Sequence, residues 1–193
     1  MNKFQFTIKE IKKWPKLAWV VICDCVNISV SHGPMVEVSD QWIVEAVWAG
    51  DYNKGDFDKT DLIFGSGVRF REDSIIFVSS GTVLDRLLYC EKNGSYIFSN
   101  SLPALLSIAK LELQTNYLTY SKDIRSITRG LKNRINIIPT VKEDIISVFY
   151  NNLVFNGKTV VEVEKIDTAP QFACYSDYKN FLIKTATELG KNA

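Results

Sequence analysis

Cysteine thiols and a single imidazole are the side chains of this sequence that could support nucleophilic catalysis. The thiols belong to Cys23, Cys25, Cys90 and Cys174, and the imidazole belongs to His32. A thiol beside a histidine base is the arrangement used for attack on amide and ester carbonyls. His32 stands in SVSHGP, at the expected end of a strand, where a surface or capping role is the ordinary one. Cys23 and Cys25 are two residues apart in the same predicted strand, so we expect their side chains to share one face.

Metal chemistry finds little support in the sequence. The Cys23–Cys25 spacing is shorter than the usual Cys-x2-4-Cys of zinc sites, and no second cysteine pair supplies the remaining ligands. Buried, reduced thiols are therefore expected. The aspartates between residues 51 and 61 lack the ordered spacing of a calcium loop and predict a solvated loop: Asp51, Asp56, Asp58 and Asp61.

Two basic features leave alternatives open. Asp85 and Arg86 form either a structural ion pair inside a sheet, which we favour, or an anion clamp. A local basic patch is either a solvated face or a contact for a phosphate or an acidic partner; it comprises Arg125, Arg129, Lys132 and Arg134. Over the whole chain, 23 basic residues balance 22 acidic ones. This balance argues against nucleic acid or anionic lipid as the main partner. No apolar run is long enough for a membrane span, and a cytoplasmic location is expected.

The elements that must position these side chains are mostly β-strands. Residues 16–33 predict one long strand, and 42–48, 62–70 and 74–79 predict three more. Asn93-Gly94 predicts a tight hairpin turn, and Asn156-Gly157 marks the turn of another hairpin in 144–166. Three helices are expected. The first covers 102–113 with Ser101 as its N-cap, the second lies within 119–131 with Ser121 as its N-cap and Gly130 as its stop, and the third lies within 176–193 with Ser176 as its N-cap. Hairpins and helices in this order predict an α+β domain built on antiparallel sheet.

From residue 62 onward, the order of elements resembles the N-terminal domain of asparagine synthetase and its relatives. Residues 85–89, DRLLY, are similar to the "pLYY" strand of that family, and GSYIFSNSLPALL (94–106) matches its hairpin-to-helix motif. Residues 113–118 and 135–163 correspond to later segments of the family. The family domain is a class II glutamine amidotransferase with an N-terminal-nucleophile (Ntn) hydrolase fold. The resemblance thus implies an Ntn-hydrolase-like sandwich of antiparallel sheets flanked by helices.

The resemblance also implies where the domain ends. It assigns residues 1–175 to the glutamine amidotransferase-like domain. Residues 176–193 look like the first helix leading toward a C-terminal synthetase domain that this sequence does not contain. The apolar or aromatic residues near that exit are the candidates for interdomain packing: Tyr175, Tyr178 and Phe181.

Departures from the family pattern decide the expected activity. The family nucleophile is a cysteine exposed as residue one after methionine removal, whereas this chain begins Met1-Asn2. The Arg-Gly-Pro-Asp, Asn-Gly-Glu and Asp-Gly-Asp motifs of the glutamine pocket are absent from its first half. The resemblance therefore implies a catalytically silent domain, a scaffold of the kind found in β-lactam synthetase and lasso-peptide cyclases. No catalytic residue and no cofactor is assigned to this domain, and ATP and Mg²⁺ would serve the implied synthetase domain.

Two alternatives remain beside the scaffold. One is a free-standing interaction module whose tryptophan-rich first part binds a partner protein. The other is a glutamine amidohydrolase activated by processing at Cys23 or Cys25. The expected partners are the synthetase domain of the same chain and a second copy in a homodimer, with no nucleic acid and no membrane.

Overall fold

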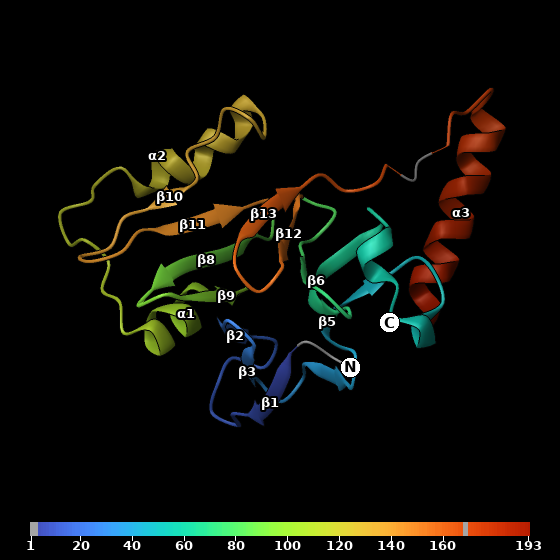
Figure 1. The fold of residues 1–193 in the computed structure, drawn as a ribbon. Helices are drawn as coiled ribbons and strands as arrows, with labels where there is room; N and C mark the ends of the chain where they lie inside the picture. Colours follow the sequence, from blue (N-terminus) through green and yellow to red (C-terminus); the bar gives the residue numbers. More distant parts are fainter. Residues whose placement is uncertain (1–3, 168–169) are drawn as a thin grey trace.

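Alternating apolar residues build two β-sheets that pack face to face in the computed structural model, which describes residues 4–167 and 170–193 (Figure 1). The seven-stranded sheet has the order β1 (Gln5–Glu10), β3 (Asn27–His32), β2 (Trp19–Asp24), β9 (Ser95–Ser99), β8 (Leu87–Lys92), β11 (Ile145–Val148) and β10 (Ile137–Ile138). The six-stranded sheet has the order β13 (Val160–Val163), β12 (Asn152–Phe155), β7 (Ile75–Val78), β6 (Ile63–Phe70), β5 (Trp42–Trp48) and β4 (Glu37–Ser39).

The pairing confirms an α+β class with predominantly antiparallel sheet. Every pair of neighbouring strands is antiparallel except β1 and β3, which run parallel from Gln5 opposite Asn27 to Glu10 opposite His32. The predicted elements began at residue 16, so the sequence analysis did not anticipate this parallel edge strand.

The main core fills the space between the two sheets. Trp19, Val21 and Cys23 of β2 face the six-stranded sheet, and the Phe77 and Phe98 rings stack across the interface with centroids 3.7 Å apart. Burial of such apolar area is the dominant force that holds two sheets together.

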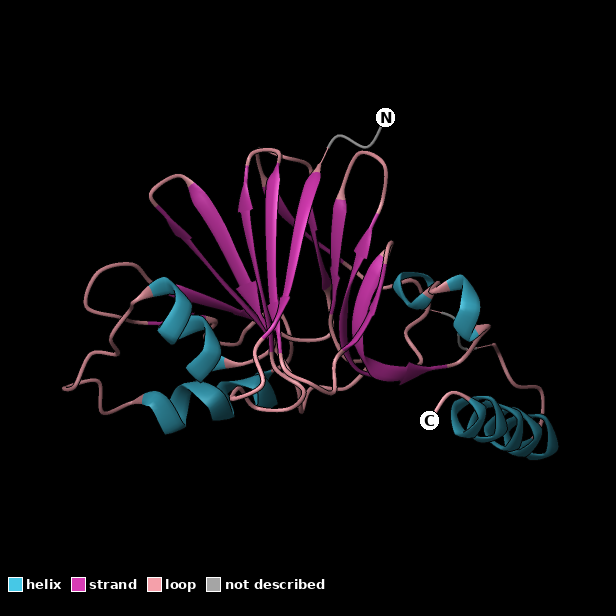
Figure 2. Cartoon of the chain, turned by 90° about the horizontal axis from the view of Figure 1, so that it is seen from below, coloured by secondary structure: helices cyan, strands magenta, loops and turns pink. Residues whose placement is uncertain are grey.

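Helices cover the outer faces of both sheets (Figure 2). On the seven-stranded sheet, Ala104, Leu105 and Ala109 of α1 (Leu102–Ala109) pack over Val20 and Leu88. On the six-stranded sheet, Phe57 packs against the tryptophans of β5 from the short 3-10 helix η2 (Phe57–Lys59), which follows η1 (Tyr52–Lys54). The seven-stranded sheet is therefore covered by an α-helix, whereas the six-stranded sheet is covered by a loop that contains two single-turn 3-10 helices.

The hairpin predicted at Asn93-Gly94 is confirmed. Asn93 has φ 52° and Gly94 has φ 79°, as a two-residue turn of the type I′ class requires, and Lys92 pairs with Ser95 across it. Helix α1 begins at Leu102 after Ser101 as expected. It ends at Ala109 and not near residue 113, because Lys110 adopts a left-handed conformation with φ 50°.

The long strand predicted for residues 16–33 is wrong. The chain reverses at Cys25 and Val26, so that β2 and β3 form a hairpin in which Asp24 pairs with Asn27. Cys25 adopts φ 48° at this turn. The reversal occurs without a glycine or asparagine at its two central positions, where such a residue usually marks the turn.

The later elements follow the predictions with shifted bounds. α2 (Tyr120–Arg125) starts after Thr119, not Ser121, and continues as η3 (Ser126–Arg129) up to Gly130. α3 (Tyr175–Lys191) begins one residue before Ser176. Residues 144–166 form the predicted hairpin only in β12 and β13, since β11 belongs to the other sheet and the chain crosses between the sheets at Tyr150.

Candidate functional site

The two cysteines of the first hairpin lie in opposite environments. Cys23 is 1% exposed within the core between the sheets, and burial raises the pKa of its thiol far above the ordinary range. Cys25 is exposed on the turn. The expectation that both side chains share one face is therefore wrong, because the turn ends β2 at Asp24. A thiol that resists ionisation is a poor nucleophile.

The remaining thiols are also divided between core and surface. Burial raises the pKa of Cys90 to about 11, and Cys174 is exposed just before α3. All four cysteines are free, so the expectation of buried, reduced thiols holds for burial only at Cys23 and Cys90.

The histidine does not serve a thiol. His32 is 7% exposed, and its Nδ1 lies 2.8 Å from the carbonyl oxygen of Gly33. Its expected position on the surface is wrong, although the contact to a neighbouring carbonyl is of a capping kind. Among the described residues, no hydrogen bond joins this imidazole to a cysteine, and its neighbours on the two adjacent strands are Trp19 and Glu10.

A polar chain links the two sheets through the core. Trp19 Nε1 donates to Ser66 Oγ at 3.0 Å, and Ser66 Oγ donates to Glu45 Oε1 at 2.5 Å. Asn100 Nδ2 donates to the same carboxylate oxygen at 3.1 Å, and Asn100 Oδ1 accepts from the Trp19 amide at 2.9 Å. Burial raises the pKa of Glu45, while the bonds from Ser66 and Asn100 oppose that rise. The bonds of this chain all join one structural element to another, so it braces the sandwich.

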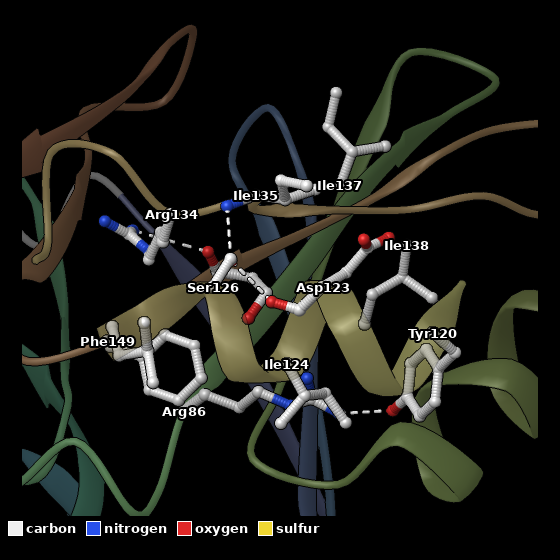
Figure 3. Close-up of a pocket in the computed structure, with 12 residues that line it drawn as sticks. Arg86, Tyr120, Asp123, Ile124, Ser126, Arg134, Ile135, Ile137, Ile138 and Phe149 are labelled. Carbon is white, nitrogen blue, oxygen red and sulfur yellow. Dashed lines mark hydrogen bonds between the residues drawn. The ribbon is translucent and has the colours of Figure 1, made fainter. Parts of the chain in front are cut away.

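The expected ion pair between Asp85 and Arg86 is not among the ion pairs of the described residues. The Arg86 guanidinium donates to the Tyr120 hydroxyl at 2.7 Å, which fastens α2 to the seven-stranded sheet (Figure 3). Beside it, Ser126 Oγ accepts from the Ile135 amide at 2.7 Å. The cavity between these side chains measures about 10 Å³, which is room for about one water molecule.

The basic patch is split by the fold. Arg134 turns inward, with a side chain 7% exposed, whereas Arg125, Arg129 and Lys132 stay on the surface. Arg134 and Lys132 line a larger polar cavity of about 490 Å³ that is open to solvent. Its other lining residues are Leu131, Asn136, Tyr150, Asn151, Glu162, Glu164 and Lys165.

The sequence predicted a solvated loop for the acidic segment, but the structure shows part of this segment in ion pairs. Arg71 Nη2 lies 2.7 Å from Asp58 Oδ1 and 3.4 Å from Asp56 Oδ1, and the Asp58 side chain is 5% exposed. The segment is therefore pinned to the end of β6 and packs over Trp42. Among the described residues, no group of three or more metal-ligating side chains gathers here or elsewhere.

The proposed partner surfaces fare differently. Trp19, Trp42 and Trp48 are at most 8% exposed and belong to the core, whereas Trp14 is only partly buried. Tyr175 is 76% exposed and Tyr178 42% exposed on α3. Phe181 packs on Phe172 with ring centroids 5.3 Å apart.

Helix α3 touches the sandwich at its far end. Asn192 Nδ2 donates to the carbonyl oxygens of Trp48 and Gly50, at 2.7 and 3.0 Å, and α3 contains no buried residue. Figure 1 shows the helix standing beside the six-stranded sheet, apart from α1 and α2. None of the helices described here combines the length and the apolar character that crossing a membrane requires.

Comparison with known proteins adds no family assignment: no protein-family model matches the chain, and no curated protein shows significant similarity to it.

Proposed function

We propose that this chain is a catalytically silent, glutaminase-like scaffold domain for an ATP-dependent amide-forming synthetase domain. The observation that carries the proposal is the placement of the thiols. Cys23 is sealed between the sheets, and Cys25 lies on an exposed turn, with no histidine bonded to it in the described part of the chain. The arrangement of two packed antiparallel sheets is compatible with an Ntn-hydrolase-like sandwich.

Activation by processing is disfavoured by the topology. Cleavage before Cys23 would cut β2, which lies between β3 and β9 in the seven-stranded sheet. Cleavage before Cys25 would separate β1 and β2 from β3, and with them the core residues Trp19 and Val21. Either cut would open the hydrophobic core while creating the new terminus. The chain therefore supports the silent scaffold better than the amidohydrolase.

The scaffold role rests on α3. A helix that leaves Tyr175, Tyr178 and Leu182 at least 42% exposed retains apolar area that a second domain can cover. The same helix is tied to the end of β5 through Asn192, so a domain that binds α3 is also positioned relative to the sandwich.

Two measurements test the proposal. Ammonia release from glutamine is measured for the wild-type chain and for Cys23→Ala and Cys25→Ala, and all three are expected to be inactive. Turnover that disappears in either variant would show that a thiol is catalytic after all. The intact mass of the native gene product is then compared with the 21.9 kDa of this chain. A clearly larger mass supports an attached domain, and an equal mass would sink the scaffold role within one chain.

A further inference from the structure

Two deeply buried cations line the same polar cavity. The Arg134 side chain is 7% exposed and Lys165 is 8% exposed, and both line the cavity of about 490 Å³. Burying a cation is costly unless an anion or a full set of hydrogen bonds compensates for the lost water. The partners of each cation therefore decide whether the cavity is complete without a ligand.

Arg134 is only partly compensated. Its Nη1 donates to the carbonyl oxygen of Leu131, and its Nη2 lies 3.4 Å from the carbonyl oxygen of Ser147 and 3.5 Å from Glu162 Oε1. Its Nε is buried without a hydrogen-bond partner among the described residues. Glu162 is itself shared, since it accepts from Asn151 Nδ2 at 2.7 Å. The centroid of the Phe149 ring lies 5.9 Å from the guanidinium carbon, and one long ion pair leaves the positive charge of Arg134 only partly neutralised.

Lys165 has one hydrogen bond, and the carboxylates of Asp61 and Asp58 favour its charge from beyond ion-pair distance. Its Nζ donates to Asn152 Oδ1 at 2.7 Å, and that oxygen also accepts from the Ser79 amide at 3.3 Å. Within the described part of the chain, no carboxylate oxygen forms an ion pair with Lys165 inside 4.0 Å. A neutral amide cannot balance an ammonium charge. Burial accordingly lowers the pKa of Lys165 to about 8, against the opposing effect of Asp61 and Asp58.

The backbone between the two cations is held in an uncommon conformation. Tyr150 lines the cavity with φ 64°, and its carbonyl oxygen accepts from Ser79 Oγ at 2.5 Å. A bulky residue with positive φ costs free energy, and such positions concentrate at ligand-binding and active sites. This turn places Asn151 and Asn152 so that their amides bond Glu162 and Lys165.

We propose that the cavity binds a small anionic ligand, with a carboxylate or phosphate group received by Arg134 and Lys165. The guanidinium supplies a directional pair of donors, and the ammonium supplies the second charge. The volume lies within the usual range for small-molecule sites. Glu162 and the exposed Glu164 disfavour a polyanion, so the ligand carries one compact anionic group.

The test measures anion-dependent thermal stability at constant ionic strength. Inorganic phosphate and acetate are titrated separately into the full chain, and sodium chloride is lowered at each step so that the ionic strength stays constant. A ligand that binds only the folded state raises Tm in a saturable way. We expect saturation with at least one of the two probes, and the probe that acts at lower concentration distinguishes phosphate from carboxylate recognition.

Three variants make the test specific. Arg134→Gln and Lys165→Met are each expected to weaken the anion response by about tenfold or more, the loss of one charged hydrogen-bond partner. Arg129→Gln, an exposed cation outside the cavity, is expected to keep the wild-type response. Arg134→Lys keeps the positive charge but lacks the paired N–H donors of the guanidinium, and it replaces Arg134→Gln in the test if that variant fails to fold.

A second readout does not depend on unfolding. Lys165 is acylated with acetic anhydride near pH 8 and quantified by peptide mass spectrometry, with and without the effective anion. Protection of Lys165 relative to exposed Lys158 supports the site. Any of three results would overturn the proposal. The Tm could rise without saturation, the rise could persist in both cavity variants, or the anion could leave the acylation of Lys165 unchanged.

Discussion

Trp19 of β2 and Ser66 of β6 are joined across the two sheets by an indole-to-hydroxyl hydrogen bond of 3.0 Å within the core. Ser66 passes the connection to Glu45, and Asn100 returns it to the Trp19 backbone. Buried polar chains of this kind fix the register of the elements that they connect, because each slip leaves a donor without an acceptor.

Ser66→Ala tests this connection. The substitution leaves the buried Trp19 indole N–H without its acceptor, and such an unsatisfied donor costs about 1–3 kcal/mol of unfolding free energy. Urea denaturation measures the loss. Ser29→Ala, at an exposed position of β3, is the matched control and should change the free energy by less than about 0.5 kcal/mol. An equal loss of unfolding free energy in both variants would show that the Trp19–Ser66 hydrogen bond does not stabilise the fold.

Glu45→Gln tests the charge in the same chain of contacts. Burial raises the pKa of Glu45 in the folded state above its unfolded value. The folded state therefore holds the proton to higher pH, and this contribution to stability is lost as pH rises through the folded pKa. A neutral amide at this position does not titrate and lacks that loss, so the stability of the variant relative to wild type is expected to increase between acidic and neutral pH. Urea midpoints across that range check the sign.

The thiols provide a direct test of the hairpin at residues 24–27. In the native protein, iodoacetamide is expected to modify the exposed Cys25 and Cys174 quickly and to spare the buried Cys23 and Cys90. Peptide mass spectrometry assigns the sites, and denaturation in urea should release all four. Fast native modification of Cys23 would contradict its place between the sheets and reopen its candidacy as a nucleophile.

Lys165 makes stability depend on pH in the alkaline range. Its pKa falls from 10.5 to about 8 on folding, so the unfolded chain holds more protons between these values and the free energy of unfolding rises with pH there. The full change corresponds to roughly 3 kcal/mol at about 1.4 kcal/mol for each pKa unit. Lys165→Met should remove this slope and should be more stable than wild type near pH 7. An unchanged slope in the variant would assign it to other groups.

The sequence predicted those parts of the fold that local chemistry determines. Asn93-Gly94 tolerates positive φ and marked its hairpin, and the proline after Ser101 marked the start of α1. The turn at Cys25 was missed because no turn residue stands there. The alternation of apolar residues nevertheless changes across the turn. Core-facing residues are odd-numbered before it, at Val21 and Cys23, and even-numbered after it, at Ile28 and Val30. A strand keeps one parity, so this switch indicates a reversal.

The polar cavity could not be read from the sequence. Arg134, Tyr150 and Lys165 come from a loop, a sheet crossing and the segment after β13, and no spacing rule connects them. Arg134 belongs to the predicted basic patch and Lys165 follows an alternating strand pattern, but neither pattern indicates that the side chain is buried. Only the passage of the chain from one sheet to the other buries the two cations around the same cavity as Tyr150.

The exposed face of α3 yields the last prediction. Tyr178→Ser combined with Leu182→Ser should change the stability of the isolated chain by less than about 0.5 kcal/mol, because α3 contains no buried residue. If this face binds a synthetase domain or a second copy, the same pair should weaken that association. Size-exclusion chromatography over a range of concentrations measures self-association. Pull-down with the native neighbouring domain measures binding to a synthetase domain. Lys179→Ser with Lys184→Ser, on the same helix, is the control. A large stability loss would instead place the aromatic face against the sandwich of its own chain.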